Sequence, residues 1–545
     1  MQASDPLLTV DGLTFSYEED EKPIFQNVSF QLQKGERALL LGPSGCGKSS
    51  LALCLNGLYP EACDAFQTGC VALYGKPLSD LSEPAAKSIG AVFQDPDQQF
   101  CMLTVEDEIA FGLENLQYAK EDMDRIIDDV LEKFEIPHLK KRTISGLSGG
   151  LKQKVALACI IAMGPDLIIL DEPTAQLDPY SAREFVQLIR ELQEKKGFGL
   201  LVIEHQLDHW VPWMDRTIVL DESGRKVMDG LTKDIFQFQL DELTRLGIPI
   251  PHVISLQKHL HIPFTLCKEN LFNEPFPPLS NNGRIEPSAE DALSVHHLSF
   301  KRGAETIFQD LSFSVKNGSI TAIAGPNGTG KSTLLSVLAR LNRPEDGQIK
   351  IDGRPIDSYS EKELRRHMGF VFQNPEHQFV TDTVMDELLF GFERQAAVKE
   401  KALQLLARFG LRRYVSHHPF SLSQGQKRRL SVATMLMHDV KILLLDEPTF
   451  GQDAKTAREC MQMLQEIQSE GTAVLMVTHD MELVSEYADS ILVLHDTNLV
   501  YYGSPDLLFS ERHGLVDQAK LALPLKYEWM KQDGRQRHES PAAKC

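Results

Sequence analysis

The chain repeats itself, and this repeat constrains its fold more than any other feature of the sequence. The stretch LTVDGLTFSY at 8–17 returns as LSVHHLSFKR at 293–302, and later motifs return in the same order. The separation between equivalent residues is 283 positions at Lys48 and Lys331 and drops to 274 towards the end of the repeat. Such a slow change is typical of a duplicated domain with short loop insertions or deletions. The repeat therefore predicts two similar domains in one chain.

The repeat also sets the expected domain boundaries. We expect a first domain at 6–240, a connector at 241–291, a second domain at 292–521 and a polar tail at 522–545. The connector contains NEPFPPLSNNG, in which Pro, Gly and Asn disfavour helix and strand. The preceding LGIPIPHVISLQKHL has the spacing of a short, packed helix. The tail ends in KQDGRQRHESPAAKC, and its polarity predicts disorder.

Composition excludes several kinds of partner. The formal net charge of −21 repels phosphate backbones and anionic lipid heads, so we expect no nucleic-acid partner. No apolar run reaches 18 residues, because Pro165 and Asp166 interrupt the best candidate, and we expect no direct membrane insertion. The first residues, MQASDPLLTVDG, lack the pattern of a signal peptide. The nine cysteines form no CxxC pair and are interpreted as reduced thiols.

Each half carries a glycine-rich loop after an apolar run. ERALLLGPSGCGKSS and SITAIAGPNGTGKST both fit G-x-x-x-x-G-K-[ST], a pattern whose backbone N–H groups and following helix bind phosphate. Lys48 and Lys331 are expected to reach the β- and γ-phosphates of a nucleotide, and Ser49 and Ser332 to hold Mg²⁺. The complete candidate loops are Gly42, Pro43, Ser44, Gly45, Cys46, Gly47, Lys48, Ser49 and Ser50, and Gly325, Pro326, Asn327, Gly328, Thr329, Gly330, Lys331, Ser332 and Thr333.

Two adjacent carboxylates end an apolar strand in each half, in LIILDEP and ILLLDEP. Neighbouring side chains on a strand point to opposite sides, and the end of a strand is a usual phosphate-site location. We expect Asp171 and Asp446 to bind Mg²⁺, and Glu172 and Glu447 to polarise the attacking water. The alternative is that these acids only begin a surface turn before the proline that follows them.

A further motif distinguishes the chain from other phosphate-loop ATPases. LSGGLKQK and LSQGQKRR resemble the signature of ATP-binding-cassette (ABC) proteins, and the resemblance extends over both halves. It implies two α/β domains, each with a RecA-like sheet core and a helical subdomain, which bind ATP and Mg²⁺. It also implies that each ATP lies between the glycine loop of one domain and the signature of the other, so that no homodimer is required. The signature residues expected to contact nucleotide are Ser148, Gly149 and Gly150 for the ATP held by Lys331, and Ser423 and Gly425 for the ATP held by Lys48.

The same resemblance implies roles for residues between these motifs. Gln94 and Gln373 resemble the Q-loop glutamines, which contact Mg²⁺ and water and couple to a membrane subunit. His205 and His479 resemble the switch histidines, which contact the γ-phosphate. A lone histidine would more often be an ordinary surface residue, but here each follows an apolar strand in an equivalent place. The D-loop aspartates would be Asp178 and Asp453.

The two halves depart from the family pattern in different ways. Tyr17 occupies the place where the family stacks an aromatic ring on adenine, whereas its equivalent is Arg302. Arg302 could stack through its guanidinium plane, or adenine could bind less tightly at the second site. Leu151 and Gln424 are unusual residues within the two signatures. Because both glutamates and both histidines are retained, we expect two hydrolytic sites, which need not be equal.

The stretch after each Q-loop, FQDPDQQFCMLTVEDEIAFGLEN and FQNPEHQFVTDTVMDELLFGFE, resembles energy-coupling-factor importers of vitamins and metal ions, notably those for thiamine or its hydroxymethylpyrimidine precursor. This resemblance implies an ATPase at the cytoplasmic face of the cell membrane, with a transmembrane scaffold subunit and a small substrate-binding membrane subunit as partners. A coupling helix of the scaffold would enter a groove in each half; the alternative is that the groove phenylalanines are ordinary core residues. The groove residues would be Phe100, Phe111, Phe379 and Phe390, with Glu106, Asp107, Asp386 and Glu387 at the rim.

Two other functions compete with import. A tandem cassette that acts on ribosomes would have a basic surface and a long charged connector, and neither is present. A DNA-maintenance ATPase would need a long coiled-coil or zinc insertion within a domain, but only 54 positions separate Gln94 from Ser148. Import is therefore the leading hypothesis.

Overall fold

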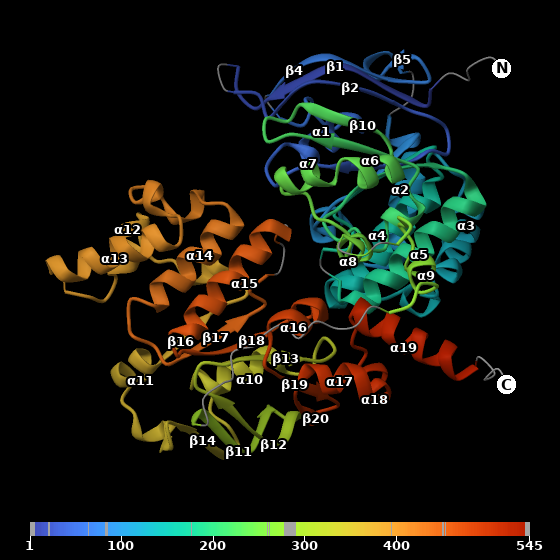
Figure 1. Cartoon of the computed structure of the whole chain (residues 1–545). Coiled ribbons are helices and arrows are strands. Elements are labelled where there is room, and N and C mark those ends of the chain that lie inside the picture. Colours follow the sequence, from blue (N-terminus) through green and yellow to red (C-terminus); the bar gives the residue numbers. More distant parts are fainter. Residues whose placement is uncertain are drawn as a thin grey trace. The chain divides into compact units, whose positions relative to one another are not determined.

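Two compact units of similar construction make up the chain. The computed structural model describes residues 6–539 apart from 20–21, 64, 82–84, 176, 259, 261, 277–289, 394, 450–451 and 453. The units comprise Met1–Leu271 and Phe272–Cys545, and are called unit 1 and unit 2 here. Each contains a four-stranded antiparallel sheet and a six-stranded, mainly parallel sheet (Figure 1). The predicted duplication of an α/β domain is confirmed.

Unit 1 is built from ten strands and nine α-helices within its described residues. The small sheet has the order β2 (Phe25–Leu32), β1 (Leu8–Ser16), β4 (Phe66–Leu73), β5 (Lys76–Pro77). The large sheet has the order β10 (Lys226–Leu231), β9 (Arg216–Leu220), β3 (Arg37–Leu41), β8 (Gly199–Ile203), β7 (Leu167–Asp171), β6 (Ile89–Val92). The helices are α1 (Lys48–Leu55), α2 (Val105–Asn115), α3 (Lys120–Lys133), α4 (Gly149–Met163), α5 (Pro179–Lys196), α6 (Thr232–Phe238), α7 (Leu240–Arg245), α8 (His252–Gln257) and α9 (Lys268–Leu271).

Unit 2 repeats this plan. Its small sheet has the order β12 (Glu305–Lys316), β11 (Asp291–Arg302), β14 (Asp346–Ile351), β15 (Arg354–Pro355). Its large sheet has the order β16 (Met368–Val371), β17 (Ile442–Asp446), β18 (Ala473–Val477), β13 (Ile320–Ala324), β19 (Ser490–His495), β20 (Asn498–Gly503). The helices are α10 (Lys331–Leu338), α11 (Glu361–His367), α12 (Val384–Leu389), α13 (Ala396–Arg408), α14 (Gln424–Met435), α15 (Ala454–Ser469), α16 (Met481–Tyr487), α17 (Pro505–Glu511), α18 (His513–Gln518) and α19 (Leu525–Glu539).

The large sheet of unit 1 is covered on both faces, which explains why its strands are continuous apolar runs. On β3, Ala38 and Leu40 pack against α1 and the small sheet, whereas Leu39 and Leu41 pack against the helical side. This alternation follows from the period of two along a strand. Figure 1 shows the small sheet and α2–α5 in different parts of unit 1. The core therefore fixes β3, and with it the glycine loop that follows.

The first part of the predicted connector folds onto unit 1. The short helix expected there is α8, in which Val253 and Ile254 are buried. Leu243 of α7 and Leu271 of α9 are also buried. Most of the Pro- and Asn-rich stretch lies in 277–289, outside the described residues. The boundary between the units falls after Leu271, well inside the expected connector.

The predicted disorder of the tail is wrong for its first part. Residues Leu525–Glu539 form α19, and Leu525, Tyr527 and Trp529 are buried. The N–H of Leu525 donates to Glu482 Oε1 at 2.6 Å, and Trp529 Nε1 donates to the carbonyl of Glu274 at 2.8 Å. These contacts hold the helix on unit 2. Residues 540–545 lie outside the described part.

In the described ranges, no helix is both long and apolar enough to span a membrane.

Candidate active site

The predicted catalytic residues of each unit meet at one edge of the large sheet. In unit 1, β6, β7, β8 and β3 are parallel, so that their carboxyl ends lie together. The glycine loop follows β3, Glu172 follows β7, His205 lies two residues after β8, and Gln94 lies two residues after β6. In a parallel sheet this edge is where ligands bind. Residues that follow four different strands in the sequence therefore lie close together in space.

The glycine loops have the shape that phosphate binding requires. Gly47 and Gly330 precede α1 and α10 with φ of 93° and 86°. A Cβ on Gly47 would lie 2.7 Å from Ile24 Cγ2, so only glycine fits this turn. Lys48 Nζ donates to the carbonyls of Gly42 and Pro43 at 2.8 and 3.0 Å, and the lysine of unit 2 makes the same two bonds. Each ammonium group therefore lies over its own loop.

The carboxylates that end β7 and β17 fit a divalent cation. Ser332 Oγ donates to Asp446 Oδ1 at 3.0 Å. In unit 1, Asp171 Oδ1 is buried without a hydrogen-bond partner among the described residues. Burial raises the pKa of Asp171 to about 6, a rise that a hydrogen bond from Ser49 opposes, and burial also raises the pKa of Asp446. A buried carboxylate beside a serine hydroxyl offers the hard oxygen ligands that Mg²⁺ prefers.

Each predicted water-polarising glutamate pairs with the predicted histidine of its own unit. His205 Nε2 lies 3.1 Å from Glu172 Oε1, and His479 Nε2 lies 3.0 Å from Glu447 Oε1. Burial would raise the pKa of Glu172, but the hydrogen bond and charge of His205 outweigh burial and lower it. A glutamate with a lowered pKa is ionised at neutral pH and can accept a hydrogen bond from water.

The Q-loop glutamines differ between the units. Gln94 Nε2 donates to Glu172 Oε2 at 2.7 Å, which brings glutamine, glutamate and histidine together in unit 1. No hydrogen bond between the side chains of Gln373 and Glu447 occurs in the described structure of unit 2. The duplicated motifs therefore do not make identical contacts.

The signature residues stand at the first turn of a helix in each unit. Ser148 is the N-cap of α4, and Ser423 is the N-cap of α14, where its side chain accepts the N–H of Gln426. Both serines are exposed. The N–H groups of a first helical turn are available to an anion. Contact of each signature with the nucleotide of the other unit stays a prediction, and Asp453 of the second D-loop lies outside the described residues.

The adenine-stacking position also differs. The Tyr17 ring is partly exposed, contacts Phe15 edge-on at 5.2 Å, and its hydroxyl lies 3.2 Å from Ser50 Oγ at the start of α1. Arg302 is exposed at the end of β11. The neighbouring Phe300 is buried against Phe308, with ring centroids 5.7 Å apart, so it is not available for adenine. Weaker adenine binding in unit 2 stays a prediction.

Two buried glutamates shape the stretch after each Q-loop. Glu108 accepts the N–H groups of Cys101 and Met102 at 2.9 and 2.7 Å. Glu387 accepts those of Val380 and Thr381 at 3.1 and 3.0 Å. The predicted place of Glu387 at the rim of a groove is therefore wrong, because its carboxylate is buried and turned inward to hold the loop.

Sequence analysis missed Glu204, which immediately precedes the switch histidine. The Glu204 carboxylate is buried and accepts Thr174 Oγ1 at 3.0 Å and the N–H of His205 at 3.0 Å. Burial raises its pKa from 4.5 to about 7. Unit 2 has Thr478 in this place, which cannot titrate. The mismatch between VIEH and VTHD in the repeat could have indicated that unit 1 has an extra acidic residue beside its histidine.

Replacing Glu204 with Gln is expected to reduce the pH dependence of the stability of unit 1. The folded state holds the Glu204 proton more tightly than the unfolded state, whose pKa is near 4.5. The resulting stabilisation of unit 1 is complete below pH 4.5 and is lost as the pH rises through about 7. Between pH 5.5 and 8, the unfolding free energy of the original protein should fall by about 1–3 kcal/mol more than that of E204Q. Urea unfolding at both pH values measures the difference, with exposed Glu132→Gln as the control. Parallel pH profiles for the original protein and E204Q would contradict the assignment.

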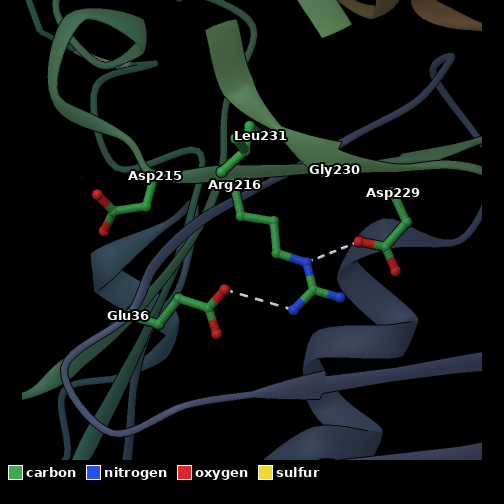
Figure 2. A pocket seen from close by; sticks show the side chains of 6 residues that line it. All are labelled: Glu36, Asp215, Arg216, Asp229, Gly230 and Leu231. Carbon is green, nitrogen blue, oxygen red and sulfur yellow. Dashed lines mark hydrogen bonds and ion pairs between the residues drawn. The ribbon is translucent and has the colours of Figure 1, made fainter. Parts of the chain in front are cut away.

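A pocket in unit 1 lies outside this site (Figure 2). Arg216 Nε donates to Asp229 Oδ1 at 2.6 Å, and its Nη1 donates to Glu36 Oε1 at 3.3 Å and to the carbonyl of Gln31 at 2.7 Å. These bonds connect β9 and β10 with β2 of the small sheet. None of the predicted site residues lines the pocket, whose lining is Glu36, Asp215, Arg216, Asp229, Gly230 and Leu231. Arg216 pairs with Glu36 and Asp229, and Asp215 pairs with Arg37 outside the lining, which makes the cluster a brace between the sheets.

The fold and the site define a two-domain phosphate-loop ATPase with an ABC signature in each unit. The ABC transporter family model matches residues 25–175 in unit 1 and 308–450 in unit 2. The chain is 67% identical over 532 residues to a Bacillus subtilis (strain 168) protein named "Putative HMP/thiamine import ATP-binding protein YkoD". The match covers 97% of this chain and 97% of the relative. The chain therefore belongs to the ABC transporter family, and it is an ATPase with two ATP-binding domains.

Two further matches have lower sequence identity. A "Putative ABC transporter ATP-binding protein" of Methanosarcina mazei is 34% identical over 550 residues, covering 96% of this chain and 93% of the relative. Among solved structures, cbiO1 from Clostridium perfringens, described as part of the ABC transporter complex cbiONQ, is 31% identical. That match covers 44% of this chain and 99% of the solved chain, with a TM-score of 0.39.

Proposed function

We propose that this chain is the ATP-hydrolysing subunit of an energy-coupling-factor type importer, at the cytoplasmic face of the cell membrane. The observation that carries the proposal is the 67% identity, over nearly the whole chain, to a protein named for HMP/thiamine import. A thiamine precursor, thiamine or a related small vitamin is accordingly the proposed cargo. The proposed partners are a transmembrane scaffold and a small substrate-binding membrane protein.

Exposed apolar side chains after each Q-loop support a membrane partner. Leu103 is 81% exposed in unit 1, and Phe390 is 64% exposed in unit 2. Large exposed apolar side chains that gather on one face are typical of interaction sites. The loops that carry Leu103 and Val380 are held by the buried Glu108 and Glu387, so their shape is set before a partner binds. We propose that these surfaces receive the scaffold.

The proposed chemistry is the same in both units. Lys48 and Lys331 bind the terminal phosphates, and the glutamates after β7 and β17 orient and polarise the attacking water. Mg²⁺, when bound, supplies charge neutralisation at the phosphates. The residues that would hold it are Ser49, Gln94 and Asp171 in unit 1, and Ser332, Gln373 and Asp446 in unit 2.

We also propose that each nucleotide is bound by residues of both units. The signature serines and glycines of each unit would bind the γ-phosphate of the nucleotide that the other unit holds. ATP would then favour the closed arrangement of the pair, and hydrolysis would release it. This motion would reach the scaffold through the two Q-loop surfaces.

Gentle purification from native membranes, followed by mass spectrometry, tests the import proposal. We expect to recover a multi-span scaffold protein and a small membrane protein with this chain. Phe390→Asp should reduce that recovery at least about fivefold, because it places a charge in a desolvated contact, and should leave ATP hydrolysis unchanged. Phe238→Asp is a matched control, since Phe238 is 69% exposed on α6, away from the Q-loop.

The alternatives give different results. Recovery with ribosomes, and without a membrane protein, would overturn import and leave the ATPase intact. Full recovery of the membrane partners with Phe390→Asp would keep import but exclude this surface as the contact in unit 2.

A further inference from the structure

One buried arginine on the signature helix contacts two other catalytic segments of unit 2. Arg428 lies on α14, five residues after the cap Ser423, and is 3% exposed. Its Nη1 donates to the carbonyl of Phe372 at 2.5 Å, and its Nη2 donates to the carbonyl of Gln373 at 2.6 Å. Nη2 also donates to the carbonyl of Glu447 at 3.2 Å. The guanidinium group therefore joins the signature helix, the Q-loop and the glutamate that follows β17.

These bonds act on a backbone that needs support. Glu447 has a φ of 50°, in the left-handed region that a residue with a side chain rarely adopts. Such a conformation persists only when the surroundings hold it. The planar, permanently charged guanidinium group can bond several carbonyls at once in a fixed geometry. Arg428 is thus suited to fix where the Glu447 carboxylate points, although it does not contact that carboxylate.

Unit 1 has a different residue in this place. Gln153, five residues after Ser148, is 2% exposed, and its Nε2 has no hydrogen-bond partner in the described part of the chain. Glu172 also has a positive φ, of 47°. There the Q-loop side chain holds the Glu172 carboxylate directly, because Gln94 Nε2 donates to Glu172 Oε2 at 2.7 Å. The two units connect the Q-loop to the catalytic glutamate in different ways.

We propose that Arg428 is a positioning residue that fixes Glu447 and the Q-loop of unit 2 on the signature helix, and that unit 1 performs this task through the side chain of Gln94. The inference rests on the proposed role of Glu447 in hydrolysis. It assigns to unit 2 a dependence on Arg428 that unit 1 does not share at Gln153. Arg428 donates no hydrogen bond to the glycine loop or to Lys331, so its replacement should change kcat more than KM for ATP.

The test compares kcat and KM for ATP in the full chain carrying R428Q, R428K, R429Q or E447Q. R428Q should lower kcat towards the value of E447Q, because misplacing the glutamate should reduce the rate of hydrolysis in unit 2 about tenfold. KM for ATP should stay within about twofold of the original value. R428K should give an intermediate kcat, since an ammonium group can bond only part of this set of carbonyls. R429Q removes the same charge from the neighbouring residue, which pairs with Glu459 instead, and should match the original protein.

Each contrary result is distinct. An unchanged kcat for folded R428Q, or a raised KM with kcat unchanged, would overturn the proposal. If R428Q does not fold, as judged by circular dichroism, R428K decides: a folded R428K with the original kcat overturns the proposal, and a lowered kcat at unchanged KM supports it. Undiminished hydrolysis by E447Q would instead overturn the role of Glu447 itself, whatever R428Q shows.

Discussion

Replacing both Glu172 and Glu447 with glutamine is expected to lower kcat by about 10³-fold while ATP remains bound. Each carboxylate lies within 3.1 Å of a histidine Nε2, at the sheet edge that carries the glycine loop. The amide has the same shape but cannot draw a proton from water, so turnover should stop after binding. Phosphate release under steady-state conditions, together with ATP retained after gel filtration, measures both effects.

The single variants separate the two units. E172Q and E447Q should each keep the nucleotide loops intact, because Lys48 and Lys331 donate to carbonyls of their own loops, and these bonds do not involve the glutamate side chains. Glu132→Gln, on the exposed face of α3, provides a control without a site contact. Undiminished hydrolysis in the double variant would remove both glutamates from the water-polarising role.

Replacing Trp529 with alanine is expected to destabilise unit 2 by about 3–5 kcal/mol, the usual cost of deleting a large buried aromatic side chain. Trp529 is 1% exposed on α19, and its ring contacts Phe276 edge-on with centroids 5.4 Å apart. The variant also loses the bond from Nε1 to the carbonyl of Glu274. Urea unfolding of the full chain measures the change, and the transition of unit 1 serves as an internal reference.

Trp529→Phe distinguishes packing from hydrogen bonding. Phenylalanine keeps most of the ring but leaves the carbonyl of Glu274 unpaired, so we expect a loss of about 1–2 kcal/mol. An alanine variant with the unfolding midpoint of the original protein would show that α19 adds nothing to unit 2.

Local sequence was sufficient for the nucleotide loops and the strand-end carboxylates. The conformation of a glycine loop is set by its own residues, as the φ of 93° at Gly47 illustrates, and the following helix begins at the next residue. Apolar runs such as LIILD become buried strands because both sheet faces are covered. The duplication then places each motif twice. These features depend on neighbours in the sequence, and the structure has the loops and the carboxylates at the strand ends where the motifs predict them. Their roles in nucleotide binding and hydrolysis stay predictions.

Contacts between distant segments were not predictable in this way. Arg428 and Phe372 are 56 residues apart, and only the packing of α14 beside β16 makes the arginine a partner of the Q-loop. Glu204 and Glu387 look like ordinary acidic residues in the sequence. The surrounding fold buries both side chains. Burial raises the pKa of Glu204, and the Glu387 carboxylate accepts hydrogen bonds from backbone N–H groups.

The C-terminal helix α19 shows most clearly what could not be predicted from local sequence. The sequence predicted a disordered tail from the polarity of its last residues, and the alternation of Leu525, Tyr527 and Trp529 with polar residues does not form the apolar stripe of an amphipathic helix. Glu482 and the segment before the second domain supply the partners that order it. Sequence therefore determined the two domains and their catalytic motifs, which need only local geometry. Tertiary structure decided how the units differ and where α19 packs, because those depend on groups that only folding brings together.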